Sequence, residues 1–224
     1  MLAHYLVDKI PMKDSLLNIQ LLLTGNEIMS GDTVDSNSAL IAQRFGEAGL
    51  GIYRKVTVGD DVTLLRTELA DMATKADLII VNGGLGPTID DLTAEILAAV
   101  AGVPLQEHPQ AVAHLERWCA KRNLQLDAAN LKQSMLPQGA KIVDNPIGSA
   151  VGFEMTLGNC RIICTPGVPS ELAAMLGPMV ADLATQVQQA PGRDILRLQT
   201  FGLGESTAQQ IISDAAFRAC LAWW

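Results

Sequence analysis

The residues best suited to chemistry lie between Asp77 and Thr93, where a short apolar run ends in a loop rich in glycine. The loop reads Asn82-Gly83-Gly84-Leu85-Gly86-Pro87-Thr88, and two adjacent carboxylates, Asp90 and Asp91, follow it. Glycine lets the backbone bend and lets a ligand approach the amides, so this loop could hold a phosphate. The two aspartates could then hold a divalent cation against that phosphate, or they could cap the helix that follows.

A second group of polar and acidic residues follows the apolar run Asn18 to Leu23. Glu27 comes directly after that run with no helix predicted beside it to cap, so we expect it to act as a metal ligand or general base. Asp60 and its neighbour Asp61 have a simpler alternative role as caps of the helix after Gly59, and Asn37 could merely stabilise its own turn. The turn Thr165 to Glu171 is either a rigid connection or a further wall of the same site.

The residues expected to form the site fall into two groups. The candidate catalytic residues are Asp90, Asp91 and Glu27, and Asp90 and Asp91 are also the candidate metal ligands. The candidate ligand-binding residues all lie in or near loops that follow apolar runs. They are Thr24, Gly25, Asp35, Asn37, Asp60, Asn82, Gly83, Gly84, Gly86, Thr88, Pro166 and Gly167.

The elements that must position these loops alternate along the chain. Apolar runs at 18–23, 51–58 and 78–81 predict strands, and helical patterns between them predict covering helices. Such alternation is typical of a parallel sheet whose right-handed crossovers gather the loops after the strands along one edge. Ligands in these folds bind outside the carboxyl ends of the strands, so the candidate residues should meet there.

We therefore expect an α/β fold with three layers, in which a mostly parallel sheet carries helices on both faces. Residues 151–156 and 160–164 predict a short β-hairpin, residues 104–109 a break and residues 130–136 a short helix. Residues 1–17 are predicted to form an N-terminal extension, 18–187 the main domain, 188–194 a linker and 195–224 a partial α+β segment. Because that segment is too small for its own core, we expect a homo-oligomer, with a dimer as the first expectation.

Composition narrows the classes of function. The chain has 224 residues, 49% hydrophobic and 18% charged, which suits a packed core. A formal net charge of -8, without a cluster of Lys and Arg, argues against nucleic acid as a partner. No apolar run suggests a membrane span, and four cysteines without paired spacing suit reduced thiols, so we expect a cytoplasmic protein.

Five motifs in this order resemble the CinA (competence/damage-inducible protein A) family. They are Thr24-Gly25-Asn26-Glu27, Val34-Asp35-Ser36-Asn37, Thr57-Val58-Gly59-Asp60-Asp61, the stretch from Asn82 to Asp91, and Thr165-Pro166-Gly167-Val168-Pro169-Ser170-Glu171. The resemblance implies a fold similar to MoaB/MogA-type molybdenum-cofactor domains. From residue 195 the sequence also looks like the start of the KH-like segment of that family, while the family's C-terminal deamidase domain is not in this chain.

The resemblance further implies a small-molecule nucleotide of the ADP-ribose type as substrate and a divalent metal ion (Mg, Mn or Co) as cofactor. The first hypothesis is accordingly metal-dependent hydrolysis of ADP-ribose to AMP and ribose 5-phosphate. The alternatives are molybdopterin-type binding or adenylyl transfer, and a nucleotide-binding module without catalysis. Asn26 stands where the family often has aspartate, which would remove one acid from the site.

Overall fold

The computed structural model describes residues 17–187, 201–204, 206, 207 and 210. Its contacts divide the chain into two units, Met1–Gly192 and Arg193–Trp224, and the first holds all the elements of regular structure described below. The predicted extension, linker and C-terminal segment lie outside the described residues, apart from Leu17 and a few positions between Phe201 and Gln210.

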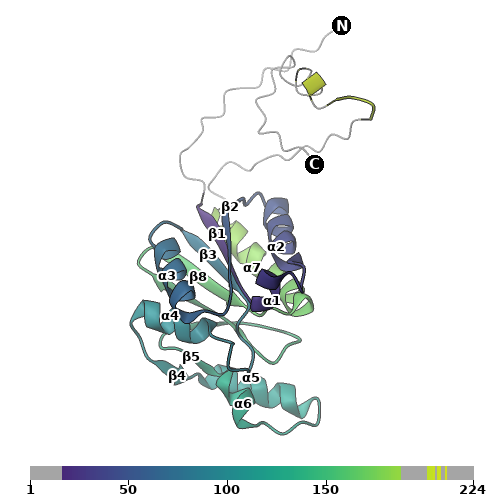
Figure 1. Cartoon of the computed structure of the whole chain (residues 1–224). Coiled ribbons are helices and arrows are strands. Elements are labelled where there is room, and N and C mark those ends of the chain that lie inside the picture. The colour runs from purple at the N-terminus through teal and green to yellow at the C-terminus, as the bar shows by residue number, and fades with distance from the viewer. Residues whose placement is uncertain (1–16, 188–200, 205, 208–209, 211–224) are drawn as a thin grey trace. The chain divides into compact units, whose positions relative to one another are not determined.

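A six-stranded sheet forms the centre of the first unit, in the order β2-β1-β3-β8-β7-β6 (Figure 1). Its strands are β1 (Ile19–Thr24), β2 (Ile52–Val58), β3 (Leu78–Asn82), β6 (Lys141–Val143), β7 (Gly152–Leu157) and β8 (Cys160–Thr165). Strands β2, β1, β3 and β8 pair in parallel, whereas β7 is antiparallel to both of its neighbours. The sheet is therefore mostly parallel, and the predicted hairpin is β7–β8.

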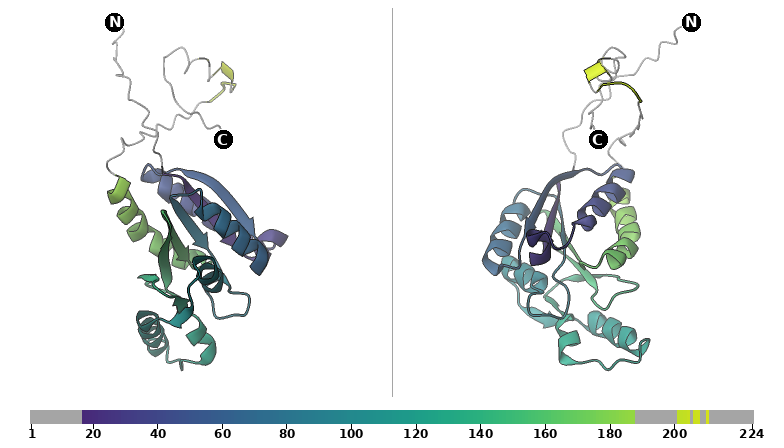
Figure 2. Two further views of the ribbon diagram at one scale, coloured as in Figure 1. Left: turned by 90° about the vertical axis from the view of Figure 1, so that its left-hand side faces the viewer. Right: turned by 45° about the vertical axis from the view of Figure 1, so that its right-hand side comes forward.

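Helices cover both faces of this sheet, which confirms the three-layer α/β fold (Figure 2). They are α2 (Ser36–Glu47), α3 (Val62–Ala73), α4 (Thr93–Ala101) and α7 (Pro169–Val187). Successive strand residues face opposite ways: Leu23 joins the apolar core that holds Phe45 of α2, and Leu22 joins the core that holds Leu69 of α3. Within the described ranges, no helix has the length and apolar character needed to cross a membrane.

A smaller part of the unit lies beyond one end of the sheet and differs from expectation. It contains the two-stranded antiparallel sheet β4 (Leu105–Glu107) and β5 (Met135–Pro137), with α5 (Pro109–Ala120) and α6 (Ala128–Lys132). The predicted break at 104–109 thus contains the strand β4. The helix predicted at 130–136 ends at Lys132, and the strand β5 begins at Met135. Each strand has only three residues, too few for a period of two to be visible.

A short helix that the sequence did not predict, α1 (Asn26–Ser30), follows β1 directly. None of its residues is buried. The sequence of α1 therefore lacks the helical spacing of apolar residues from which a helix is predicted. It ends at Gly31, whose φ of 82° lies in the left-handed region that glycine adopts without a steric penalty. Glu27 therefore lies in the first turn of a helix, contrary to the expectation that no helix adjoined it.

Candidate functional site

A cleft of about 560 Å³ opens at the carboxyl edge of the sheet. Strands β1, β3 and β8 end there at Thr24, Asn82 and Thr165, and the register pairs Asn82 with Thr165. A cleft of this volume falls within the range of small-molecule sites. The position agrees with the expectation that loops after parallel strands converge at one edge.

Every candidate site residue singled out from the sequence lines this cleft. The set comprises Thr24, Gly25, Glu27, Asp35, Asn37, Asp60, Asn82, Gly83, Gly84, Gly86, Thr88, Asp90, Asp91, Pro166 and Gly167. Sequence reasoning missed Gln133, Ser149 and Ala150 as lining residues, whereas Glu171 belongs to the turn that it expected to be either a rigid connection or a wall of the site. The grouping supports one common site, while the chemical role of each residue stays a prediction.

The glycine loop offers free backbone donors, but not from every glycine that we expected. The Gly83 N–H donates to the Thr165 carbonyl oxygen at 3.0 Å, so it is not available to a phosphate. The N–H groups of Gly84, Leu85 and Gly86 have no protein acceptor within the described part of the chain. Successive free amides in a turn form a site that attracts anions.

Packing and backbone geometry require two of these glycines. Gly83 has a φ of 110°, and a Cβ placed there would lie 2.6 Å from the Thr24 carbonyl oxygen. Gly84 has a φ of 66°, and its Cβ would lie 2.5 Å from Thr93 Oγ1. Substituting either residue would therefore disturb the fold whether or not a ligand binds there.

The helix that follows the glycine loop does not reach the cleft. Helix α4 begins only at Thr93, and none of its residues lines the cleft. The longer helix α7 reaches the cleft instead, because Pro169 at its start and Glu171 in its first turn both line it. A helix N-terminus favours anionic groups, and α2 also begins at the cleft with Ser36 and Asn37, so both α7 and α2 are placed to act on a ligand.

The two adjacent aspartates do not cap α4, whose N-cap is Leu92 without a side-chain hydrogen bond. Both carboxylates instead converge on Thr88. Its hydroxyl lies 2.6 Å from Asp91 Oδ2 and within hydrogen-bonding distance of Asp90 Oδ1, and its N–H donates to Asp91 Oδ2 at 2.8 Å. The Thr88 hydrogen bond lowers the pKa of Asp90, and the charge of Lys132 acts in the same direction. The hydrogen bonds to Thr88 therefore hold the two carboxylates side by side at the end of the loop.

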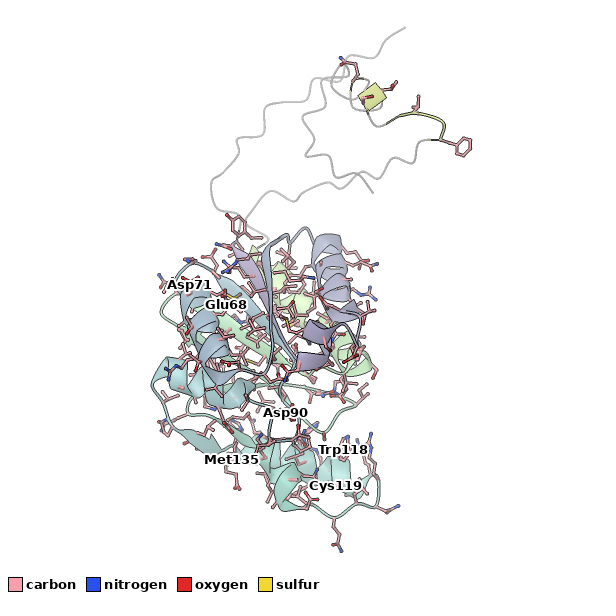
Figure 3. The ribbon with its side chains drawn as sticks, in the orientation of Figure 1. Glu68, Asp71, Asp90, Trp118, Cys119 and Met135 are labelled. Atoms are coloured by element: carbon pink, nitrogen blue, oxygen red, sulfur yellow. The ribbon has the colours of Figure 1, made fainter. Side chains whose placement is uncertain are left out.

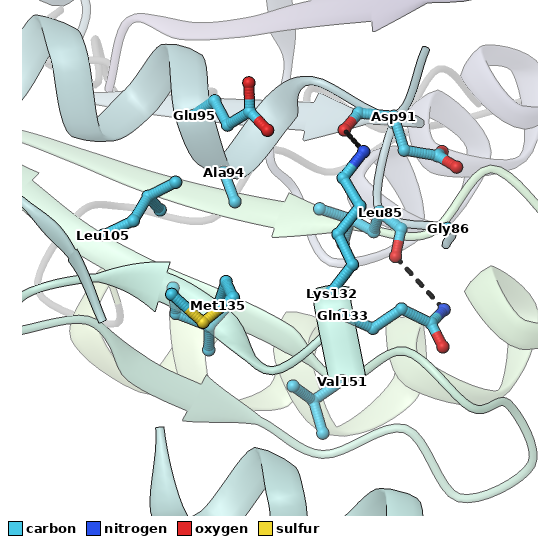
Figure 4. Close-up of a pocket in the computed structure, with 12 residues that line it drawn as sticks. Leu85, Gly86, Asp91, Ala94, Glu95, Leu105, Lys132, Gln133, Met135 and Val151 are labelled. Carbon is cyan, nitrogen blue, oxygen red and sulfur yellow. Dashed lines mark hydrogen bonds between the residues drawn. The ribbon is translucent and has the colours of Figure 1, made fainter. Parts of the chain in front are cut away.

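Lys132 fixes the backbone of this carboxylate segment from α6. Its ammonium group donates to the carbonyl oxygens of Thr88 and Asp91, the latter at 2.9 Å. A small cavity of about 30 Å³ lies beside it, between the glycine loop and β5, and has room for a water molecule (Figure 4). In Figure 3, Asp90 lies between the main sheet and the end of α5 that carries Trp118 and Cys119.

Asp35 is committed to structural contacts, although it lines the cleft. It is the N-cap of α2 and accepts from Ser38 N at 2.9 Å, and it pairs with Lys55 Nζ at 3.0 Å. Burial would raise the pKa of Asp35, but the hydrogen bonds from Ser38 and Lys55 outweigh it and lower the pKa below its ordinary value.

Asp60 likewise makes structural contacts, but not as a helix cap. Asp61 is the N-cap of α3, where it accepts from Leu64 N at 2.8 Å. Asp60 instead accepts from Thr24 Oγ1 at 2.8 Å and from Asn26 N at 3.0 Å, so it joins the loops after β1 and β2. Glu27 differs from these acids, because its exposed carboxylate has no hydrogen bond to the described part of the chain.

Amide side chains form the floor of the cleft. Asn37 Nδ2 donates to Asn82 Oδ1 at 2.9 Å and to the Gly167 carbonyl oxygen at 2.8 Å. Asn82 Nδ2 donates in turn to Thr165 Oγ1 at 3.1 Å and to the Pro166 carbonyl oxygen at 2.8 Å. These bonds tie α2, β3 and the turn after β8 together, so Asn37 does more than stabilise its own turn.

The oxygen atoms available in the cleft suit a cation that protein and ligand bind together. They are less suited to a cation that the protein binds alone. Among the described residues there is no group of three or more His, Cys, Asp or Glu side chains that could hold a metal ion. Asp90 and Asp91 supply two hard oxygen donors next to the free amides of the glycine loop. Magnesium is commonly bound by one or two carboxylates together with ligand phosphates, so these residues fit that arrangement.

Comparison with known proteins first defines the class. A family model described as probable molybdopterin binding domain matches residues 20–185. The Mog protein of molybdopterin biosynthesis from Mycobacterium ulcerans shares the fold, with a TM-score of 0.53 and 20% identity, covering 77% of this chain and 98% of that one. Residues 20–185 therefore belong to the family of probable molybdopterin binding domains and share the fold of the Mog protein.

The chain belongs to the CinA family. A CinA-like protein from Colwellia psychrerythraea is 51% identical over 197 residues, which are 88% of this chain and 46% of the relative. The crystal structure of CinA from Thermoplasma acidophilum, whose function is unknown, gives a TM-score of 0.68 at 32% identity and covers 75% of this chain and 98% of that one. The chain spans about half the length of the curated relatives that it matches.

Proposed function

We propose that the cleft binds a phosphorylated small molecule with a heterocyclic ring, and that a molybdopterin-type ligand is the first candidate. The observation that carries this proposal is the run of free N–H groups at Gly84, Leu85 and Gly86 inside a cleft of about 560 Å³. Backbone amides bind phosphate without needing a basic side chain, and none of the residues lining the cleft is Lys or Arg.

The pterin-type ligand is supported by the class of the domain. The matching family model bears the name of a molybdopterin-binding domain, and the Mycobacterium ulcerans neighbour is named for molybdopterin biosynthesis. Exposed apolar side chains at the cleft, Val34 and Val168, would suit the face of a flat ring. Binding of a pterin-type ligand does not require the protein to catalyse a reaction, so the proposed function is binding.

The binding proposal is tested by titrating purified protein with molybdopterin and with ADP-ribose under the same conditions. We expect saturable binding of molybdopterin that inorganic pyrophosphate reduces by competing for the glycine-loop amides. Binding of neither ligand would overturn the proposal. Tighter binding of ADP-ribose than of molybdopterin would overturn the pterin-type assignment and leave a nucleotide site.

A second candidate, hydrolysis of a nucleotide pyrophosphate such as ADP-ribose, is favoured by one specific observation. Two carboxylates, Asp90 and Asp91, lie beside the free amides, and Thr88 hydrogen-bonds to both. A divalent metal ion bound there would neutralise pyrophosphate charge and lower the pKa of a bound water. The residues of the chain would orient the ligand, and the free carboxylate of Glu27 could accept a proton from water.

The hydrolysis candidate is tested by incubating the protein with ADP-ribose and Mg²⁺, Mn²⁺ or Co²⁺ and measuring AMP. If the protein hydrolyses ADP-ribose, AMP release should fall strongly in Asp90→Ala and persist in Asp144→Ala. Asp144 is the control because its exposed carboxylate lies outside the cleft. AMP release no higher than that of Asp90→Ala with all three metals would reject hydrolysis and leave the binding proposal intact.

A further inference from the structure

The wall of the cleft that α7 forms carries one carboxylate, Glu171. This residue lies in the first turn of α7, lines the cleft and is half-buried. Its Oε2 accepts a hydrogen bond from Asn145 Nδ2 at 2.8 Å. Its Oε1 accepts no hydrogen bond from the described part of the chain, and it is not one of the unpaired side-chain atoms that are buried. Oε1 is therefore accessible to solvent on a residue that lines the cleft.

The contacts of Asn145 fix which of its atoms faces Glu171. Asn145 is fully buried, its Nδ2 also donates to the Ala150 carbonyl oxygen at 2.7 Å, and its Oδ1 accepts from the Gly148 N–H at 2.9 Å. A carbonyl oxygen only accepts and a backbone N–H only donates, so the amide cannot be turned round. The loop between β6 and β7 therefore presents a fixed donor to Oε2 and holds the carboxylate in one position.

Gly148 in the same loop leaves room for this carboxylate. A Cβ placed at Gly148 would collide with Glu171 Oε2 and with Asn145 Nδ2. The φ of Gly148 does not lie in the left-handed region, so its backbone conformation does not require glycine. The requirement is for space, because any larger residue would displace the Oε2 side of the carboxylate from the loop.

The structural roles usual for an acid at this position leave the second oxygen of Glu171 unused. The helix dipole favours an acid in the first turn, and a glutamate there often accepts from a backbone N–H at the start of the helix. Within the described ranges Glu171 makes no such hydrogen bond and no ion pair, and no Lys or Arg lines the cleft. A fixed carboxylate with one accessible oxygen is an acceptor for an N–H or O–H donor of a ligand.

We propose that Glu171 determines which ring the cleft accepts, with Asn145 as its positioning residue. A carboxylate accepts hydrogen bonds and does not donate them, so it pairs with a ring edge that carries an N–H beside an amino group. Guanine and pterin rings present that edge, whereas adenine places an unprotonated nitrogen beside its amino group. This inference rests on the proposed function, because it takes the ring of a phosphorylated ligand to lie in the cleft. Among nucleotides it selects guanine, and not the adenine of ADP-ribose.

The experiment compares GMP with AMP by calorimetry, using the full chain in buffer with EDTA. The two probes share ribose and phosphate, so the ratio of GMP affinity to AMP affinity isolates the effect of the ring. We expect wild-type protein to bind GMP at least about 10-fold more tightly than AMP. Glu171→Gln should turn its oxygen towards Asn145 Nδ2 and its amino group towards the ring, which lowers the ratio to about 1 or below. Glu116→Gln, which changes an exposed acid of α5 outside the cleft, is the matched control and should keep the wild-type ratio.

Equal affinity of wild-type protein for GMP and AMP would overturn the inference. So would the same ratio in Glu171→Gln as in wild type, because a purely structural Glu171 would change stability, or both affinities together, without changing the ratio. Inorganic pyrophosphate has no ring and should bind to Glu171→Gln and to wild type with affinities within about 3-fold of each other. Failure of wild-type protein to bind GMP, AMP and pyrophosphate would instead overturn the phosphate site of the proposed function.

Discussion

Asn26 and Asp60 exchange two hydrogen bonds across the loops after β1 and β2. The Asn26 N–H donates to Asp60 Oδ2 at 3.0 Å, and the Asp60 N–H donates to Asn26 Oδ1 at 3.1 Å. Asn26 itself does not line the cleft. In this structure Asn26 therefore connects two loops, and the expectation that it removes one acid from the site stays a prediction.

The first prediction concerns this pair. Asn26→Asp keeps an oxygen that can accept from the Asp60 N–H, so we expect ligand affinity within about 2-fold of wild type. Asn26→Ala removes that acceptor and should lower the free energy of unfolding by about 1 kcal/mol. Denaturant unfolding and calorimetry measure the two effects. A large gain or loss of affinity in Asn26→Asp would show that position 26 reaches the ligand.

The second prediction concerns Asp35 and pH. Its folded-state pKa lies below the ordinary value of 3.8, so its contribution to stability is present above that value and is lost as pH falls through the folded-state pKa. Asp35→Asn keeps an acceptor for Ser38 N but loses the charge that pairs with Lys55. We expect a deficit of up to about 1 kcal/mol at pH 7 that shrinks below about pH 4.

Urea unfolding at a series of pH values measures that deficit, with the exposed Asp144→Asn as the matched control. A deficit that stays constant from neutral to acid pH would show that the Asp35 charge is unimportant.

The third prediction concerns Lys132, which holds the carbonyl oxygens of Thr88 and Asp91. Lys132→Met should loosen this segment and weaken pyrophosphate binding about 10-fold, because the amides and carboxylates lose their fixed positions. Lys141→Met removes an exposed lysine on β6 and is the control for net charge. An equal loss of pyrophosphate affinity in the two variants would show that Lys132 acts only through its charge at long range.

The fourth prediction concerns the thiols of β8. Burial, with a smaller effect from the Asp77 charge, raises the pKa of Cys160 to about 11, and burial alone raises that of Cys164. Both should resist alkylation at pH 8 until the protein unfolds, because the thiolate is the reactive form. Mass spectrometry after iodoacetamide treatment, with and without denaturant, measures this. Rapid labelling of Cys160 in folded protein would contradict its burial.

The sequence predicted the main sheet and the convergence of the candidate residues, because apolar runs and the loops after them are local features. It could not predict which loop amides are free. Gly83 loses its N–H to Thr165, and that follows from the pairing of β3 with β8, two strands that are far apart in the sequence. Nor could it find Gln133 and Lys132, because the segment around β5 brings them to the glycine loop and that strand has only three residues.

The most direct test of the account follows the backbone amides of ¹⁵N-labelled protein during titration with pyrophosphate. Substitution cannot test the glycine loop cleanly, because a Cβ at Gly83 would meet the Thr24 carbonyl oxygen at 2.6 Å. We predict that the amide resonances of Gly84, Leu85 and Gly86 shift with saturation, while Gly83, already bonded to Thr165, shifts least. Unchanged resonances at all three positions, or saturable shifts confined to another part of the chain, would contradict the proposed phosphate site.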